Sequence, residues 1–420
     1  MTYSIYRARL GDRDEKSLSL DELRQIWDTT VAENIFVICK TPMAKAITRR
    51  TLAGFRNSPV NAHYFDDLIN YLRNKQEKFI ERVLKKSYWK KGGGKMKFDA
   101  VVGNPPYQEE TDGSGRQAKP IYQYFVKNAK KISSNYISLI IPSRWFAGGM
   151  GLDDFRNEMM HAKHIKKLVD YVNAKDCFPT SSISGGVCFF LIDKNYNGDC
   201  KFINVQNGKI DEIIRALDEF PVLVRYNKAI SIIRKVIGNT EKFLPSMMSS
   251  LMPFGLNTNY RGVNKRISEE QLTLYASGDS ITYINRNEIS AGFDYVDKFK
   301  VMISKTSAEH AGEPSNEGNF KVLTSSMKVL KPNEVCTHSY FLTGFFEEQQ
   351  SAENIICYLK TKFVRFLVLM SLTSINVSKL VFNFVPVQDF SRSWTDEDLY
   401  SKYGLSDEEI NFIESTIKPM

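Results

Sequence analysis

A short apolar run, Phe98–Val102, ends abruptly at the tetrapeptide Asn104-Pro105-Pro106-Tyr107. The Val-rich run is typical of a fully buried strand. The two prolines end that strand, because neither of them can donate a hydrogen bond to a sheet ladder. Asn104 and Tyr107 are therefore expected at the carboxyl end of a strand, which is where open α/β sheets bind their ligands.

The tetrapeptide offers the groups that chemistry on an exocyclic amine requires. The side-chain carbonyl of Asn104 and the backbone carbonyl of Pro105 can each accept a hydrogen bond from one amino group. Two such bonds on one side turn the nitrogen lone pair toward an electrophile. Tyr107 adds a flat face against which a base extruded from its stack can rest.

These residues resemble the catalytic motif of amino-methylating DNA methyltransferases, in particular the Eco57I-like adenine-specific methylases of restriction-modification systems. The resemblance implies S-adenosylmethionine as cofactor, double-stranded DNA as substrate, and catalytic roles for Asn104, Pro105, Pro106 and Tyr107. The same tetrapeptide occurs in methyltransferases that act on protein glutamine and on RNA, so these substrates stay open. A strand that ends in a proline turn without any catalytic role is the remaining alternative.

Length and charge set the outer limits of the interpretation. A chain of 420 residues is long for one domain and suggests two or three. With 42% hydrophobic and 25% charged residues, the composition is that of an ordinary globular protein. The net charge of +9 favours a polyanionic partner.

The cysteines and the apolar segments indicate a cytoplasmic protein. The six cysteines form no CxxC pair and have no histidine at metal-ligand spacing, so we expect core thiols rather than a metal site or a disulfide framework. No apolar stretch reaches membrane-spanning length, and the first residues lack the apolar core of a signal peptide. No membrane association is expected.

Two strands are predicted before the motif, Asn34–Cys39 and Val60–Phe65, with a helix between them that begins at Thr41-Pro42. A helix opened by Ser19 or Asp21 is expected before them, and a helix from Leu68 to Tyr88 after them. They resemble the second and third strands of the methyltransferase fold. The resemblance implies that Asp66 faces the adenine of the cofactor. The alternative is that Asp66 or Asp67 caps the next helix. The acidic residue that commonly binds the cofactor ribose is replaced here by Cys39-Lys40-Thr41.

The front of the domain lacks an expected element. No Gly-x-Gly follows an apolar run in residues 1–60, where Gly11 and Gly54 stand alone. Tyr3–Leu10 alternates as in a short strand but has no glycine-rich turn after it. We therefore expect a truncated or degenerate methylase whose first strand is missing, and a separate polypeptide that supplies the missing cofactor motif.

The alternation of strands and helices continues after the motif. A polar loop with Gly113-Ser114-Gly115 is expected beside the site, followed by a strand at Tyr136–Ile141. Arg144 and Trp145 come directly after that strand and can contact a base or a phosphate, although Trp145 is also a candidate for the core. With the strand Val187–Ile192, the pattern over residues 34–192 predicts a Rossmann-like α/β sheet that is mostly parallel and closed by an antiparallel strand.

Near residue 240 the pattern changes to short strands with interspersed basic residues, which resembles the target-recognition half of these methylases. We predict a methyltransferase domain in residues 1–239, an α+β target-recognition domain in 240–395 and a helical tail in 396–420. A solvated surface would have a similar composition. The basic residues predicted to contact DNA are Arg286, Lys298, Lys300, Lys305, Lys321, Lys328 and Lys331.

The sequence thus predicts a site-specific DNA methyltransferase that modifies the N6 amine of adenine. The alternatives are a non-catalytic DNA-binding remnant or subunit, and a methyltransferase acting on RNA or protein amines. No PD-(D/E)xK-like nuclease cluster is recognised, so cleavage is not assigned to this chain and a nuclease is expected only as a partner.

Overall fold

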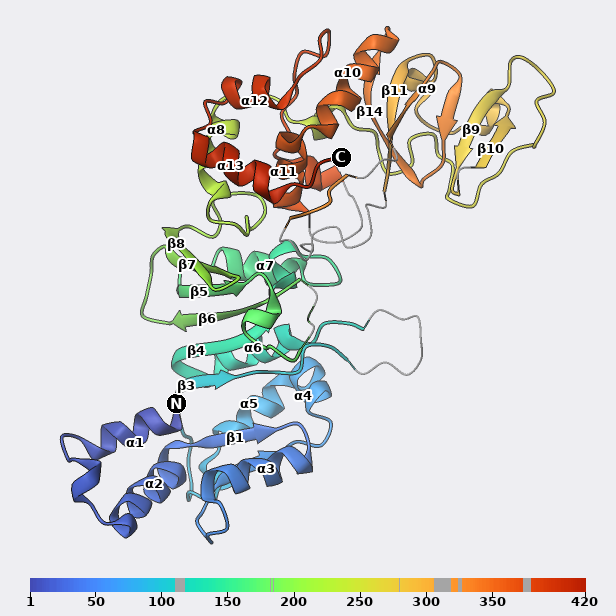
Figure 1. Ribbon diagram of the computed structural model, residues 1–420. Coiled ribbons are helices and arrows are strands. Elements are labelled where there is room, and N and C mark those ends of the chain that lie inside the picture. Colours follow the sequence, from blue (N-terminus) through green and yellow to red (C-terminus); the bar gives the residue numbers. More distant parts are fainter. Residues whose placement is uncertain are drawn as a thin grey trace. The chain divides into compact units, whose positions relative to one another are not determined.

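The computed structural model describes residues 1–109, 118–181, 183, 185–278, 280–305, 319–323, 327–372 and 379–420. The chain divides into two compact units, Met1–Ile137 and Ser138–Met420. Both units mix helices with strands (Figure 1). The chain therefore has the predicted mixed α/β character.

The first unit contains two short parallel strands and the start of a larger sheet. β1 pairs with β2 in parallel, with Phe36 opposite Asn61, as the strand-helix-strand pattern predicted. Its strands are β1 (Phe36–Cys39), β2 (Asn61–Tyr64) and β3 (Phe98–Gly103), and its helices are α1 (Thr2–Leu10), α2 (Leu20–Asn34), α3 (Pro42–Ala53), α4 (Leu68–Asn74), α5 (Gln76–Leu84) and α6 (Tyr122–Ile132), with 3-10 turns at Glu15–Ser17 and Lys86–Trp89.

The prediction that Tyr3–Leu10 alternates as a strand is wrong, because this segment is helix α1. Tyr6 and Leu10 are its buried residues, and residues four apart share one face of a helix. The Tyr6 ring meets Trp27 of α2 edge-on, with ring centroids 5.7 Å apart. Packing against α2 has therefore overridden the alternating pattern.

The predicted helix starts are confirmed by their caps. The Ser19 side chain and Glu22 form a capping box at the start of α2. Thr41 accepts a hydrogen bond from the N–H of Ala44 at 3.1 Å, and Pro42 occupies the first turn of α3. The single helix expected from Leu68 to Tyr88 is instead two helices, α4 and α5, separated at Lys75, whose φ of −127° is not helical.

An aromatic core joins β1 and β3 to the helices of the first unit. The rings of Phe36, Trp89 and Phe98 meet edge-on, and the Phe36 and Phe98 centroids are 5.4 Å apart. The buried members of this core are Phe65, Leu68, Leu72, Phe79, Val83 and Trp89. Such edge-to-face pairs add about 0.5–1.5 kcal/mol each beyond area burial.

The central sheet has six strands in the order β3-β4-β6-β5-β7-β8. β4 begins in the first unit and ends in the second, and α7 (Asp153–Met160) connects it to β5. β5 is antiparallel to β6 and parallel to β7, so the sheet is mixed and the predicted closing strand is confirmed. The hairpin of β7 and β8 was not predicted. The strands are β4 (Ser133–Pro142), β5 (Ile165–Tyr171), β6 (Val187–Asp193), β7 (Cys200–Gln206) and β8 (Lys209–Arg215).

The rest of the second unit contains two three-stranded sheets and a helical layer. The sheet orders are β10-β9-β13 and β12-β11-β14. The elements are α8 (Ala229–Gly238), β9 (Leu272–Ala276), β10 (Ser280–Ile284), α9 (Phe293–Val296), β11 (Phe299–Ser304), β12 (Met327–Leu330), β13 (Glu334–Cys336), β14 (Tyr340–Phe346), α10 (Gln349–Lys360), α11 (Lys362–Ser371), α12 (Asp396–Lys402) and α13 (Asp407–Thr416), with 3-10 turns at Ser143–Ala147, Ala174–Asp176, Leu244–Met247, Arg286–Glu288 and Lys379–Phe382.

Helix α11 is the centre of this part, since all of its residues after Lys362 are buried. Its core cluster extends from Val172 at the end of β5 to Ile417 near the C-terminus. The apolar run Ile355–Met370 forms two helices, because Thr361 leaves the helix and caps α11. The domain boundaries at residues 239 and 395 stay predictions, and the compact units divide the chain elsewhere.

The turn before β6 depends on a glycine. Gly186 has a φ of +81°, which favours glycine, and its carbonyl accepts the N–H of Ser143 at 3.1 Å. A Cβ atom on Gly186 would overlap the Arg225 guanidinium and the Tyr171 carbonyl, and would lie 2.7 Å from the Val172 carbonyl. The preceding Gly185 has the same φ and open space around it.

These two glycines give a matched pair of variants. Both Gly186→Ala and Gly185→Ala are expected to cost about 1–2 kcal/mol for the left-handed backbone. Gly186→Ala should cost about 1–3 kcal/mol more, because the added methyl group overpacks the turn. Urea-induced unfolding measures both values, and equal destabilisation by the two variants would contradict the packing described here.

Candidate active site at the carboxyl end of β3

Asn104 lies directly after β3 and is exposed. No described residue forms a hydrogen bond with its side-chain amide, so both polar groups of that amide are accessible to a substrate. Pro105 is buried, and Pro106 and Tyr107 are half-buried. The buried proline fixes the backbone next to an amide that faces solvent.

Backbone pairing holds the residues that follow the prolines. The N–H of Ile121 donates to the carbonyl of Tyr107 at 3.1 Å, and the N–H of Glu109 donates to the carbonyl of Lys119 at 3.0 Å. Residues 107–109 and 119–121 thus run beside each other. The glycine-containing loop predicted at Gly113-Ser114-Gly115 lies outside the described residues.

The prediction that β3 is fully buried is wrong. Residues of β3 are exposed or half-exposed, and Val102 is 46% exposed. The reason is topological, since β3 is the terminal strand of the six-stranded sheet while β1 and β2 form a sheet of their own. Among the residues that the structure describes, no strand pairs with the outer edge of β3.

β1 and β3 nevertheless begin close together. Their first residues, Phe36 and Phe98, are in ring contact, and Figure 1 shows both arrows pointing the same way. The two strands form no backbone ladder with each other, because β1 pairs only with β2 within the described part of the chain. Two parallel strands that are joined by side chains but not by backbone hydrogen bonds leave an unpaired edge on each strand.

Asp66 comes two residues after β2 and is exposed. It has no hydrogen-bond or ion-pair partner among the described residues. Asp67 precedes α4 in a left-handed conformation, but its side chain makes no capping bond and instead accepts the Asn70 amide at 2.7 Å. The capping alternative therefore has no support, and the cofactor role of Asp66 stays a prediction.

Arg73 of α4 connects the region of Asp66 with the segment after the motif. Its guanidinium forms an ion pair with Glu109 and lies 5.0 Å from the centre of the Tyr124 ring. Sequence analysis did not identify this residue, and its i+7 distance from Asp66 carries no motif signal. The ion pair with Arg73 holds Glu109 in place, and with it the segment that follows the Asn104–Tyr107 motif.

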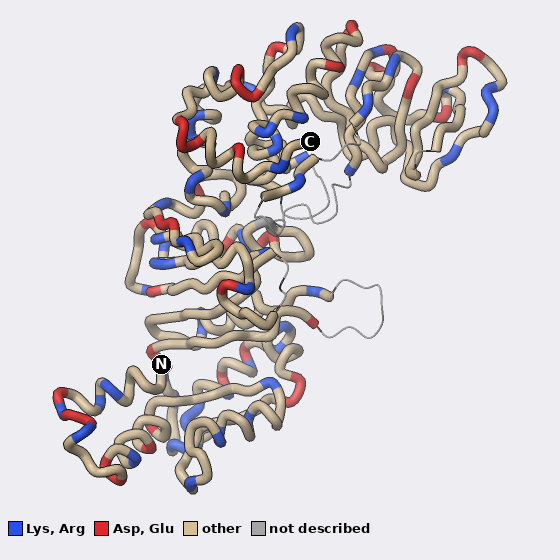
Figure 2. Tube along the Cα trace, viewed as in Figure 1, with Lys and Arg blue, Asp and Glu red and all other residues tan. Residues whose placement is uncertain are grey.

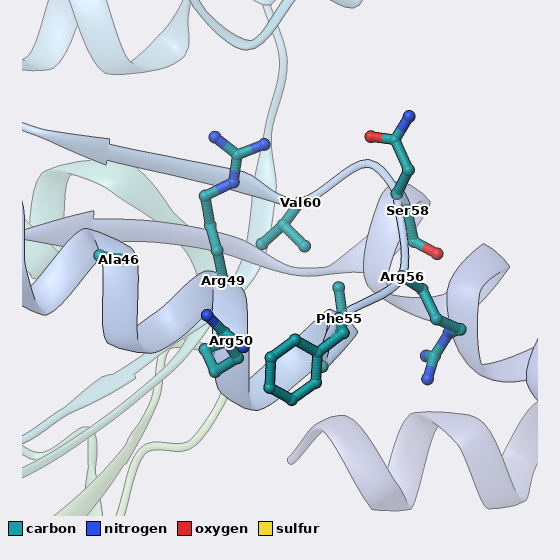
Figure 3. A pocket seen from close by; sticks show the side chains of 10 residues that line it. Ala46, Arg49, Arg50, Phe55, Arg56, Ser58 and Val60 are labelled. Atoms are coloured by element: carbon teal, nitrogen blue, oxygen red, sulfur yellow. The ribbon is translucent and has the colours of Figure 1, made fainter.

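A pocket of about 350 Å³ lies at the C-terminal end of α3 (Figure 3). It is lined by Ala46, Arg49, Arg50, Ala53, Gly54, Phe55, Arg56, Asn57, Ser58 and Val60. These residues precede β2, whereas Asp66 follows it. The pocket is thus at the opposite end of β2 from the predicted cofactor contact and is separate from the candidate site.

The structure corrects part of the predicted DNA-contacting set. Lys300 is fully buried and donates to the carbonyls of Val296, Lys298 and Lys331 at 3.0–3.1 Å. Burial lowers the pKa of Lys300 to about 8. Its ammonium group supports the turn before β11 and cannot contact DNA.

Other members of that set are engaged locally. Arg286 pairs with Asp297 at 2.7 Å, Lys298 pairs with Glu347, and Lys328 donates to the Tyr275 hydroxyl at 2.9 Å. Figure 2 shows Lys and Arg interspersed with Asp and Glu along the tube. Lys321 and Lys331 are the exposed members whose ammonium groups form neither an ion pair nor a hydrogen bond with a described residue.

Trp145 is fully buried, and its Nε1–H donates to the Cys188 sulfur at 3.4 Å. The core alternative for Trp145 is confirmed, and it cannot contact a base. Arg144, directly before it, is exposed.

Within the described ranges, no helix has the length and apolar character needed to cross a membrane.

Comparison with known proteins identifies the region around the motif. Residues 33–178 match the Eco57I restriction-modification methylase family. The predicted resemblance is confirmed over this segment, which runs from the start of β1 past β5 and contains both Asp66 and Asn104. The remaining residues lie outside the match.

A Mycoplasma pneumoniae protein described as an uncharacterized adenine-specific methylase is 36% identical over 159 residues. The match covers 36% of this chain and 37% of the relative, so the chain spans little more than a third of that protein. The description of this relative agrees with the family of the matching segment.

Solved structures of restriction-modification enzymes are similar at a low level. The type IIL enzyme MmeI in complex with DNA has 10% identity and a TM-score of 0.41, covering 95% of this chain and 63% of that one. A modification subunit of a putative type I restriction enzyme from Vibrio vulnificus has 15% identity and a TM-score of 0.30, covering 46% and 40%.

The exposure of β3 can be tested by substitution. Val102→Lys is expected to change the free energy of unfolding by less than about 0.5 kcal/mol, because the side chain already faces solvent. Val126→Lys on α6 is the contrast, since Val126 is fully buried and an unpaired buried charge costs several kcal/mol. Urea titration measures the free energy of unfolding of both variants. A large destabilisation by Val102→Lys would show that β3 is covered.

Proposed function

We propose that this chain is the catalytic part of a site-specific DNA methyltransferase that transfers a methyl group to the N6 amine of adenine within a restriction-modification system. The observation that carries the proposal is the exposed amide of Asn104 at the carboxyl end of β3, followed by Pro105-Pro106-Tyr107. This motif lies inside the segment that matches the methylase family.

The chemistry follows from the groups at this strand end. The Asn104 side-chain carbonyl and the Pro105 backbone carbonyl accept the two N–H bonds of the adenine amine, which directs the nitrogen lone pair outward. Tyr107 supports the extruded base. S-adenosylmethionine supplies a methyl group that its sulfonium already activates, so the protein contributes positioning and electrostatic complementarity more than a strong base.

The described residues supply part of a cofactor site. The exposed carboxylate of Asp66 after β2 suits a hydrogen bond from the amine of the cofactor's adenine. No Gly-x-Gly follows an apolar run in residues 1–60, so the turn at which the backbone would approach the methionine end is not found there. We propose that a segment outside residues 1–420 contributes a strand with such a turn, which would pair with the open edges of β1 and β3.

Helix α3 supports this proposal with an uncovered face. Met43 is 73% exposed and Ile47 is 59% exposed, and their spacing of four residues puts them on the same side of the helix. The helix also carries Lys45, Arg49 and Arg50 and no acidic residue. A complementary unit would therefore add a helix with an apolar face and acidic flanks.

The second unit is proposed to recognise double-stranded DNA, with Lys321 and Lys331 as remaining candidates for phosphate contacts. A non-catalytic DNA-binding remnant is the alternative function, and the unpaired edges of β1 and β3 are the observation that favours it. Methylation of RNA or protein amines remains the alternative substrate class for the same motif.

Asn104→Ala is the direct test of the catalytic assignment. When a polypeptide with the missing strand and glycine-rich turn completes the cofactor site, this variant is expected to lower the rate of N6-adenine methylation at least about 100-fold, because one of two groups that orient the amine is lost. The exposed Asn57, before β2, gives the control Asn57→Ala, which should keep full activity. Both variants should unfold like the parent. Mass spectrometry of digested DNA measures the product, and an unchanged rate in Asn104→Ala would refute the assignment.

Cofactor binding tests the incomplete cradle. The 420-residue chain alone is expected to bind S-adenosylmethionine weakly or not at all, because half of the binding groups are missing. Binding should appear when a polypeptide with the strand and glycine-rich turn is added. Isothermal titration calorimetry measures both states, and tight stoichiometric binding by the chain alone would contradict the proposal.

A further inference from the structure

The segment after β4 presents one charged side chain between two buried ones. Arg144 is exposed, whereas Ser143 is 3% exposed and Trp145 is fully buried. No described residue forms a hydrogen bond or ion pair with the Arg144 guanidinium. An arginine without an internal partner, at the carboxyl end of a central strand, is available to an external anion.

The residue before Arg144 is fixed by a buried polar network. The Ser143 hydroxyl donates to Asp170 of β5 at 2.6 Å, and the Ser143 N–H donates to the Gly186 carbonyl at 3.1 Å. Asp170 in turn binds the Arg225 guanidinium through two bonds of 2.7 and 2.9 Å. Asn204 adds a weaker contact to the same carboxylate at 3.4 Å.

The residue after Arg144 is fixed equally well. Trp145 lies among aromatic side chains, with its ring 4.7 Å from Phe146 and 5.8 Å from Phe155, and its Nε1–H points to Cys188. The backbone of Arg144 is therefore held from both sides by β5, β6 and α7. Holding it in place before binding reduces the entropy lost when the side chain engages a ligand.

Two carboxylates on the elements that hold Arg144 have other partners. Asp170 is paired with Arg225. Asp153, at the start of α7, accepts the N–H of Gly149 at 3.0 Å and lies 3.9 Å from Arg156. Neither carboxylate forms an ion pair with the Arg144 guanidinium, which is left for an outside partner.

We infer that Arg144 binds a backbone phosphate of the nucleic-acid substrate. Its planar fork of N–H donors matches two phosphate oxygens. The identity of the nucleic acid rests on the proposed function. The phosphate contact itself is inferred from the geometry around Arg144 in the second unit. Arg144 is a substrate-positioning residue, and Ser143, Asp170 and Arg225 hold its backbone.

The salt dependence of DNA binding tests this contact in the full chain. Fluorescence anisotropy with a 30-base-pair duplex gives the slope of log K against log salt concentration. Arg144→Ala should reduce the magnitude of that slope by about 0.9, which lowers the affinity about eightfold at 0.1 M salt, because one phosphate contact releases about that many counterions. Arg144→Lys keeps the charge and should keep the slope.

Arg24→Ala is the matched control. Arg24 is exposed on α2 and pairs with Asp21 at 3.2 Å, so the variant removes the same net charge far along the chain without removing the proposed contact. The Arg24→Ala variant should leave the slope of log K against log salt concentration unchanged. All three variants should unfold like the parent.

The outcomes separate the inference from the proposed function. A parent that binds duplex DNA, with the same slope in Arg144→Ala, would overturn the phosphate contact and leave the methyltransferase proposal standing. A parent that binds only single-stranded RNA, with the slope reduced in Arg144→Ala, would support the contact and contradict DNA as substrate. Failure of the parent to bind either nucleic acid would overturn both.

Discussion

The outer edge of β3 is the constraint on which the rest of the structure depends. A strand that carries a substrate-binding amide at its carboxyl end is normally flanked on both sides, because unpaired backbone groups at a sheet edge are costly to bury and prone to pair with other chains. Here β4 covers one side, and the described residues leave the other side open. Val102 on this strand is exposed, and α3 has an uncovered face of its own.

Side chains compensate for the missing backbone pairing. Phe36, Trp89 and Phe98 link β1 to β3 through ring contacts, and the core formed with α4 and α5 is closed around them. This arrangement keeps the strand ends that carry Asp66 and Asn104 within one compact unit. Aromatic packing thereby maintains the geometry of an α/β sheet whose hydrogen-bond ladder is interrupted.

The sequence was most informative where local chemistry decides the structure. We predicted the helix starts correctly from Ser19, Thr41 and Pro42, and the strand end from the prolines after Asn104. Caps and prolines act within a few residues, so these signals are local. Tyr3–Leu10 was misassigned because an alternating pattern says nothing of the contact with Trp27 that makes it a helix. The burial of β3 was overestimated for the same reason, since exposure of a strand depends on its neighbours and not on its own residues.

The candidate site shows the same division. Asn104 and Asp66 could be named from their positions after strands, and both are exposed in the structure. Lys300 could not be excluded by sequence, because an isolated basic residue between strands has the same pattern whether it faces solvent or three buried carbonyls. Arg73 and the network of Ser143, Asp170 and Arg225 join residues far apart in the chain, which no local pattern reports.

Amide hydrogen exchange, resolved residue by residue, tests most directly whether β3 is an open edge. In the 420-residue chain, alternate amides of Phe98–Gly103 are expected to exchange rapidly, because half of the N–H groups of a terminal strand point away from its only neighbour. Amides of β5, which has β6 on one side and β7 on the other, should exchange orders of magnitude more slowly. Uniform protection of β3 at the level of β5 would show that another strand covers this edge, and would contradict the account.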